Sequence, residues 1–276
     1  MGTNDEQAKL WNGTSGQAWV EAQPVLDGMF KPLTDRLIGE FPARWTGQVL
    51  DIGCGTGGTT LAIARALGTS SRCVGIDISE PLIAAAQDRA RREGIAANYI
   101  RADAQTHAFE PASVDALVSR FGVMFFGDPV GAFTNLRRAA RRQALLRLIA
   151  WRGPEENPFM TTAERAAAPF LPNIPARQPN EPGQFAFADR GRVTSMLELS
   201  GWSNIDIQPV DVTCTLAEEQ LVRYISRFGP LGRVLPGTDE ATRARIIATV
   251  RAAFDPYVQG TEVRFTAACW MVRAQA

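Results

Sequence analysis

The chain is poor in the residues that build metal sites and disulfide frameworks. It has one histidine and four cysteines in 276 residues, and no two cysteines have the C-x-x-C spacing of a zinc site. The sequence therefore predicts no metal centre and no disulfides. We expect the cysteines to be small core residues, namely Cys54, Cys73, Cys214 and Cys269.

An excess of charge and a long apolar run are also missing. Lysine plus arginine equals aspartate plus glutamate at 29 each, so no overall field attracts nucleic acid or an anionic membrane. The polar start MGTNDEQAKL does not have the pattern of a signal peptide, and no run approaches the roughly 20 apolar residues of a membrane helix. We therefore expect a cytoplasmic protein with neither a nucleic-acid nor a membrane partner.

Between residues 48 and 152, short apolar runs alternate with segments of helical periodicity. This alternation is typical of a parallel sheet covered by helices. The pattern predicts an α/β fold with a Rossmann-like, doubly wound sheet, mostly parallel with an antiparallel last strand at 261–272. Residues 1–47 are expected to form helices that cover this core, and residues 201–276 to complete the sheet. The predicted core strands are QVLDI, CVGID, NYIRAD, VDALVS and ALLRLIAW.

A proline-rich segment follows the predicted core. Residues 153–200 have little strand character before a predicted helix near Asp189 to Leu199, so they are predicted to form an inserted lid. The prolines that mark it are Pro154, Pro158, Pro169, Pro172, Pro175, Pro179 and Pro182.

The sequence GCGTGG after the first strand fits two glycine patterns. Gly53, Gly55 and Gly58 fit the dinucleotide pattern G-x-G-x-x-G. Gly53, Gly55 and Gly57 fit G-x-G-x-G, a turn that need not hold a phosphate. Glycine spacing alone does not choose between them.

Three of the predicted strands end in an evenly spaced acid, at Asp51, Asp77 and Asp103. In an open parallel sheet, ligands bind beyond the carboxyl ends of the strands. Asp77 is placed to accept hydrogen bonds from ribose hydroxyls, which suits NAD or an adenosyl cofactor. Asp51 would repel a diphosphate at the turn and attract a cation, and Asp103 can accept from the adenine amino group. Together the three acids predict S-adenosylmethionine.

At these residues the sequence resembles the class I S-adenosylmethionine-dependent methyltransferases, in the small-molecule branch that includes quinone-biosynthesis enzymes. VLDIGCGTGG is similar to the first motif of that family, VGIDIS to its ribose segment, RADAQ to its adenine segment and VDALVSRFGVMFFGDP to its fourth strand and loop. The resemblance covers about residues 48–136. Outside it, WNGTSGQAWVEAQ and LIAW are similar to the same branch.

The resemblance implies a role for each part of the cofactor site. Asp51 reaches the methionine amino group, often through water, and Asp77 holds the ribose. Arg120 and Phe121 lie near the methionine moiety, and an N-terminal helix closes over the cofactor. The cofactor-binding residues implied are Trp11, Trp19, Asp51, Gly53, Gly55, Thr56, Gly57, Asp77, Ile78, Asp103, Ala104, Arg120 and Phe121.

One stretch departs from the family pattern. Where such proteins turn through proline and glycines into the fifth strand, residues 137–147 hold five arginines and no turn signal. Either the preceding helix runs on into an irregular turn, or the coding register changes locally. A phosphate-binding role conflicts with the zero net charge, so a solvated helix face is expected.

The resemblance implies methyl transfer by in-line displacement to an acceptor that is a small molecule, with the O, N or C atom unresolved. His107 is a candidate general base, and its alternative is an ordinary loop histidine. Two other functions are left open: an NAD-dependent oxidoreductase that uses the same turn, and a non-catalytic cofactor-binding scaffold. A second copy of the chain, in a homodimer, is also left open as a partner.

Aromatic content alone favours a hydrophobic or aromatic acceptor. Phe121 and Phe125 follow the fourth predicted strand and are candidates for the acceptor wall. The lid segment and its approach supply further apolar surface, from Trp151, Phe159, Phe170, Phe185 and Phe187.

Overall fold

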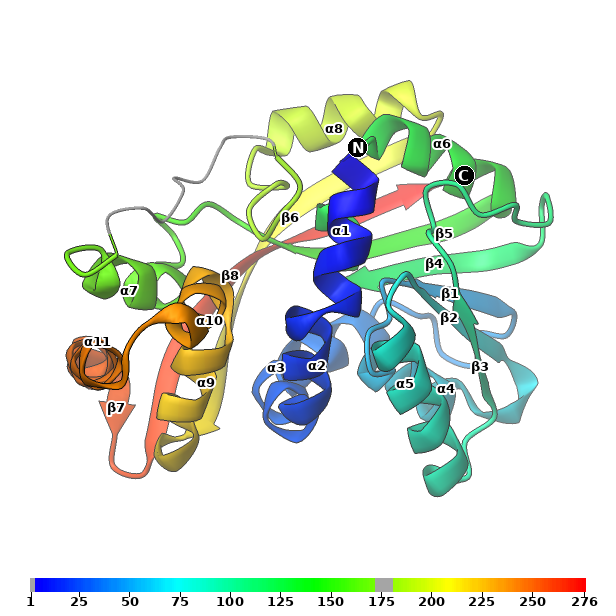
Figure 1. The fold of residues 1–276 in the computed structure, drawn as a ribbon. Coiled ribbons are helices and arrows are strands. Elements are labelled where there is room, and N and C mark those ends of the chain that lie inside the picture. The colour runs from blue at the N-terminus through cyan, green and yellow to red at the C-terminus, as the bar shows by residue number, and fades with distance from the viewer. Residues whose placement is uncertain (1–2, 172–180) are drawn as a thin grey trace.

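A computed structural model describes residues 3–171 and 181–276 and shows an eight-stranded mixed sheet with helices on both faces (Figure 1). The strand order is β3-β2-β1-β4-β5-β8-β6, with β7 paired to β8. The first five strands are parallel, and β8 is antiparallel to both of its neighbours, which confirms the predicted fold class. The strands are β1 Gln48–Ile52, β2 Arg72–Asp77, β3 Ala97–Arg101, β4 Val114–Arg120, β5 Ala140–Trp151, β6 Ser203–Ala217, β7 Val258–Gln259 and β8 Glu262–Gln275.

Four of the described helices begin at a side chain that accepts a hydrogen bond from a free backbone amide. The Ser79 hydroxyl accepts from Leu82 N, and an aspartate caps α6, α8 and α11 in the same way. The helices are α1 Thr3–Asn12, α2 Thr14–Glu21, α3 Gln23–Ile38, α4 Gly58–Leu67, α5 Glu80–Glu93, α6 Pro129–Ala139, α7 Pro158–Ala167, α8 Arg190–Leu199, α9 Leu221–Arg227, α10 Gly229–Val234 and α11 Glu240–Ala253.

The arginine-rich stretch joins α6 to β5 without a loop. Helix α6 ends at Ala139 and β5 begins at Ala140, and the pairing with β4 shifts between Val114 and Ala116. At this irregularity the β5 residues 140–145 lie opposite the β4 residues 114–116, so β5 contains more residues than β4 there. Gln143, within this segment, has a φ of 63°. The expectation of a solvated helix face is therefore wrong for residues 140–147, which belong to the sheet, because strand pairing with β4 and β8 overrides the local pattern.

The second half of the chain extends the sheet and builds a separate wall on it. Strands β6 and β8 run past the other strands, and α7, α9, α10 and α11 gather beside their far end (Figure 1). Strand β6 continues to Ala217, and α9 begins at Leu221. Helix α10 is not predicted by the sequence. Residues 172–180 of the predicted lid, with Pro172, Pro175 and Pro179, lie outside the described residues.

The four cysteines are buried and free. Burial raises the pKa of the Cys54 thiol well above its ordinary value, so this group is not an ionised nucleophile. Within residues 3–171 and 181–276, no three or more His, Cys, Asp or Glu side chains are grouped so as to hold a metal ion. None of the helices described is long and apolar enough to cross a membrane.

Candidate functional site

The glycine turn after β1 needs glycine at three positions. Gly53, Gly55 and Gly57 have φ angles of 66°, 55° and 80°, a region that other residues rarely adopt. Gly58 is the first residue of α4 and does not have a positive φ. The three strained positions therefore fall on the members of the G-x-G-x-G pattern.

Gly53 and Gly55 differ in the atoms that surround the position of a Cβ. A Cβ on Gly53 would lie 2.5 Å from the Cα of Gly122, in the loop after β4, so the two backbones pack in direct contact. A Cβ on Gly55 would meet nothing within 4 Å. Since Gly55 lines the main cavity, the open side of the turn is the side that faces a ligand.

Asp77, at the end of β2, is held in place by the turn. Its Oδ2 accepts from Gly55 N at 2.9 Å, and its Oδ1 accepts from Ser79 N at 2.9 Å. Burial raises the pKa of this carboxyl, and the two amide donors oppose that shift. Each oxygen keeps a second lone pair, so the carboxylate can still accept from ligand hydroxyls in the cavity that it lines.

Asp51 does not lie in the cavity. Its side chain is 1% exposed, and its Oδ2 accepts from the Thr60 hydroxyl at 2.6 Å, behind the turn. Its predicted approach to a methionine amino group therefore stays a prediction, and a direct contact is not available in this arrangement. Asp77 and Asp103 line the cavity and suit a ligand with an adenosine, which NAD and S-adenosylmethionine share, so these two acids do not separate the two cofactors.

Burial raises the pKa of Asp51 from 3.8 to about 7, against the hydrogen bond from Thr60. Between these two values the folded protein holds a proton that the unfolded chain does not, so stability falls as pH rises from about 4 to about 7 and levels off above that. We expect Asp51→Asn to remove that fall and to gain up to about 4 kcal/mol at pH 8.

Denaturant unfolding of both proteins between pH 4 and 8 checks this prediction. Because the pKa of Asp77 is also raised, this residue likewise makes the free energy of unfolding fall as pH rises. The quantity to compare is therefore the difference in unfolding free energy between the wild type and the variant at each pH. An identical pH profile for the two proteins would contradict the buried, proton-binding state of Asp51.

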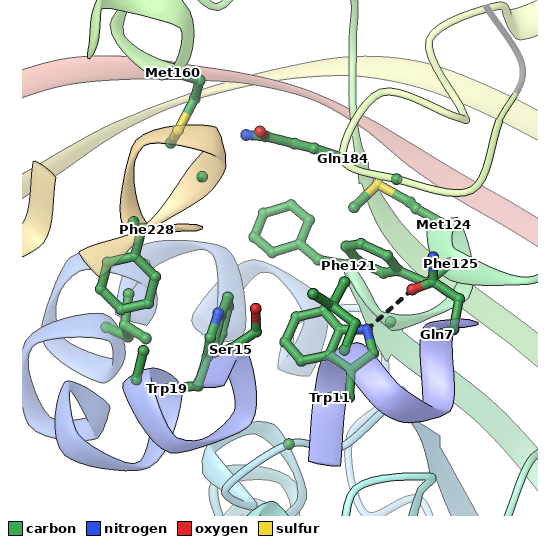
Figure 2. A pocket seen from close by; sticks show the side chains of 18 of the residues that line it. Gln7, Trp11, Ser15, Trp19, Phe121, Met124, Phe125, Met160, Gln184 and Phe228 are labelled. Atoms are coloured by element: carbon green, nitrogen blue, oxygen red, sulfur yellow. Dashed lines mark hydrogen bonds between the residues drawn. The ribbon is translucent and has the colours of Figure 1, made fainter. Parts of the chain in front are cut away.

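A cavity of about 1720 Å³ lies beyond the carboxyl ends of the strands (Figure 2). It is lined by α1 and α2, by the ends of β1, β2 and β4, by the loop before α8 and by α9 and α10. Asp51, Thr56 and Gly57 do not line it. The predicted cofactor residues that do are Trp11, Trp19, Gly53, Gly55, Asp77, Ile78, Asp103, Ala104, Arg120 and Phe121.

The N-terminal helices close one side of this cavity. The Ser79 hydroxyl donates to the Trp11 carbonyl at 2.6 Å, and Asn12 exchanges hydrogen bonds with Ile78 O and Glu80 N. The Trp11 ring meets Phe125 edge to face at a centroid distance of 5.2 Å. Helix α1 is thus fixed directly onto the segment that follows Asp77, as a cover.

His107 lies outside the cavity. Its ring packs against Phe109 at a centroid distance of 4.7 Å, and its carbonyl accepts from the Asn135 amide. It is not among the residues that line the cavity. The structure therefore supports the alternative of an ordinary loop histidine, and the general-base role has no geometric support.

Two of the residues expected in the acceptor wall are placed elsewhere. Phe187 is 2% exposed and packs near Phe133, and Phe170 lies under the guanidinium of Arg245. Both point away from the cavity because their own segments pack on α6 and α11. The other aromatic candidates do line it, namely Phe121, Phe125, Trp151, Phe159 and Phe185.

Sequence reasoning missed the wall formed by α9 and α10. Tyr224, Phe228 and Leu231 line the cavity from this side, and Figure 2 shows Phe228 and Trp19 across from Met160 and Gln184. The spacing of Tyr224 and Phe228, one helical turn apart, was the available signal. That spacing is equally typical of a core helix, so it did not identify a site.

Comparisons with known proteins agree with this arrangement. The family described as a methyltransferase domain matches residues 49–143. The uncharacterized protein Rv1403c of Mycobacterium tuberculosis is 26% identical over 181 residues, which cover 65% of this chain and 63% of that protein. The ubiquinone/menaquinone biosynthesis C-methyltransferase UbiE of Idiomarina loihiensis is 23% identical, over 58% of this chain and 68% of that protein.

The fold is also found among crystal structures. The YcgJ protein from Bacillus subtilis superposes with a TM-score of 0.58 at 17% identity, over 89% of this chain and 98% of that one. At this identity the likeness concerns the fold. The chain spans less than two thirds of the length of the mycobacterial relatives, so the fold and the methyltransferase-domain match are what these comparisons add to the site.

Proposed function

We infer that this chain, whose residues 49–143 match a methyltransferase domain, is a class I methyltransferase that uses S-adenosylmethionine. The observation that carries the inference is the cradle at the strand ends: an open glycine turn, a carboxylate fixed by two backbone amides, and a second acid beyond β3. Gly55, Asp77 and Asp103 face one cavity, in the order that a methionine chain, a ribose and an adenine require.

The residues present fit this cofactor. Asp77 would hold the ribose hydroxyls, and Asp103 and Ala104 the adenine. The backbone at Gly53 and Gly55 would lie along the methionine chain, and a Cβ at Gly55 would occupy open space on that side. When bound, the cofactor supplies a methyl group on a positively charged sulfur. Helices α1 and α2 cover the cavity, and Trp11 and Trp19 on these two helices would keep water from the reacting atoms.

The acceptor that we propose is a small hydrophobic or aromatic molecule. Single-ligand pockets are typically about 300–1,000 Å³, and this cavity of about 1720 Å³ is larger, so it has room for a second ligand beside the cofactor. Phe121 and Trp151 both line the cavity, and their rings stack at a centroid distance of 4.6 Å. These flat apolar surfaces would align an acceptor for in-line displacement.

No protein base is part of this proposal. His107, the candidate general base, does not line the cavity, so the proposal assigns the removal of a proton from the acceptor to no particular residue. The residues of the site then contribute position and exclusion of water, which are the main requirements when charge is neutralised during transfer.

Titration calorimetry tests the cofactor. We expect S-adenosylhomocysteine to bind with a dissociation constant in the micromolar range or below and NADH not to bind, since the cradle is shaped for an adenosyl thioether. Binding of NADH with no binding of S-adenosylhomocysteine would favour the oxidoreductase instead.

A screen of small aromatic acceptors with a radiolabelled methyl donor tests the reaction. We expect label to be transferred to at least one apolar acceptor. A protein that binds the donor and labels none of a broad panel would be the cofactor-binding scaffold.

A further inference from the structure

Arg120, the last residue of β4, lines the cavity and has no counter-ion in the part of the chain that the structure describes. Its Nη1 donates to the Thr34 hydroxyl at 2.8 Å and to the Phe30 carbonyl at 3.3 Å. Its Nε is buried without a hydrogen-bond partner. Among the residues that the structure describes, no carboxylate lies within ion-pair distance of the guanidinium, and no partner is found for Nη2.

The acids nearest to Arg120 are engaged with other groups. Asp51 accepts from Thr60, and Asp27 forms an ion pair with Arg89 at 2.5 Å. Burial lowers the pKa of Arg120, and the charges of Asp27 and Asp51 act in the opposite direction. A buried cation of this kind costs folding free energy unless an anion pairs with it.

Arg120 lies on the strand between the one that carries the glycine turn and the one that ends at Trp151. Strand β4 lies between β1, which carries the glycine turn, and β5, which ends at Trp151. Two residues after Arg120, Gly122 packs against Gly53, and the residue between them stacks on Trp151. Arg120 therefore enters the cavity from the strand between the glycine turn and Trp151, and its guanidinium is held there by Phe30 and Thr34 of α3.

We propose that Arg120 binds an oxyanion carried by a ligand in this cavity. The proposal rests on the proposed function, which brings such groups into the cavity from two sources. One is the carboxylate of the methionine part of the cofactor, and the other is an ionised hydroxyl or carboxyl of the acceptor. A planar guanidinium with free donors is the side chain best suited to either oxyanion.

The first arm of the test removes the carboxylate from the ligand and the guanidinium from the protein. Dissociation constants of S-adenosylhomocysteine and methylthioadenosine, which lacks the amino-acid part, are measured by calorimetry for the wild type and Arg120→Met. If the methionine carboxylate is the oxyanion, the variant loses at least about tenfold in affinity for S-adenosylhomocysteine and less than about twofold for methylthioadenosine, as expected for a charged hydrogen bond.

The second arm tests the acceptor as the source. Protein saturated with S-adenosylhomocysteine is titrated with two apolar fluorophores, the anionic anilinonaphthalene sulfonate and the neutral phenylnaphthylamine. If the acceptor brings the oxyanion, Arg120→Met weakens the sulfonate at least about tenfold relative to the neutral probe. In that case the ratio of the dissociation constants of S-adenosylhomocysteine and methylthioadenosine stays the same in the variant as in the wild type.

Two further variants separate charge from packing. Arg120→Lys keeps the cation and is expected to recover part of the loss. Arg152→Met is the matched control, because Arg152 also has a buried Nε without a partner but pairs with Glu156 and Asp211 outside the cavity. We expect it to leave both ligand ratios unchanged.

The stability of the unliganded protein gives an independent reading. Arg120→Met removes an unpaired buried cation, so its thermal midpoint without ligand is expected to equal or exceed that of the wild type, while its midpoint gains less from S-adenosylhomocysteine.

The proposal is overturned if Arg120→Met does not weaken S-adenosylhomocysteine more than methylthioadenosine and does not weaken the sulfonate more than phenylnaphthylamine. Failure of the wild type to bind S-adenosylhomocysteine would instead contradict the proposed function. The fluorophore pair, added to the free protein, would still decide the role of Arg120 in that case.

Discussion

Gly55→Ala is expected to lose S-adenosylhomocysteine binding by at least about 100-fold while the protein still folds. The φ of Gly55 is 55°, so an alanine there costs about 1–2 kcal/mol of strain. Its Cβ would meet no protein atom within 4 Å, so the fold itself offers no clash. The added methyl group would instead occupy the side of the turn that faces the cavity, where a rigid backbone cannot move away from a ligand.

Gly94→Ala is the matched control for this variant. Gly94 also has a positive φ, of 64°, and open space around its Cβ, but it follows the end of α5 and does not line the cavity. Both variants should lower the thermal midpoint by a similar amount, and only Gly55→Ala should weaken the ligand in calorimetry. Equal affinities for the two variants would mean that the open side of the turn does not receive the cofactor.

Asp77→Asn is expected to weaken S-adenosylhomocysteine by about 100-fold or more. The change removes charged hydrogen bonds to the ribose, each contributing about 1.5–3 kcal/mol. It also turns one oxygen into an amide donor, which would face the N–H of Gly55 or Ser79, so the side chain can no longer satisfy both backbone amides. The rotamer that holds the ribose is then disturbed as well.

Two comparisons make this prediction specific. Methylthioadenosine keeps the ribose, so Asp77→Asn should weaken it as much as S-adenosylhomocysteine, unlike the change at Arg120. Asp115→Asn is the control. Asp115 likewise accepts a hydrogen bond from a backbone amide, that of Gln48, but it lies near the start of β4, away from the cavity at the carboxyl end of that strand. If Asp77→Asn binds both ligands like the wild type, the ribose lies elsewhere and the cradle has been misassigned.

The cofactor half of the site could be predicted because its signals are local. A strand, a glycine turn and a capped helix are each specified by neighbouring residues, and an acid after a parallel strand must lie at the ligand edge of the sheet. Asp77 and Asp103 were found in this way. Asp51 shows the limit, because the same pattern did not reveal that its carboxylate turns behind the glycine turn toward Thr60.

The acceptor half could not be predicted in the same way. Aromatic residues give the same sequence signal whether they pack in the core, as Phe187 does, or face a cavity, as Phe185 does. The direct passage from α6 into β5 was hidden for a related reason. It depends on the pairing of β5 with two other strands. The pairing with β4 requires a register shift, and β8 lies far from residues 137–147 in the sequence.

The sequence by itself determined the sheet, the glycine turn and the acids at the strand ends, since each depends on short-range geometry and on strand direction. Only the tertiary structure decided which aromatic residues face the cavity, that α9 and α10 close it, and that Arg120 stands there without a counter-ion. The physical reason is that burial and charge pairing are set by distant segments. Thr34 and Phe30 on α3 engage the guanidinium of Arg120, but no acid comes near enough to neutralise it.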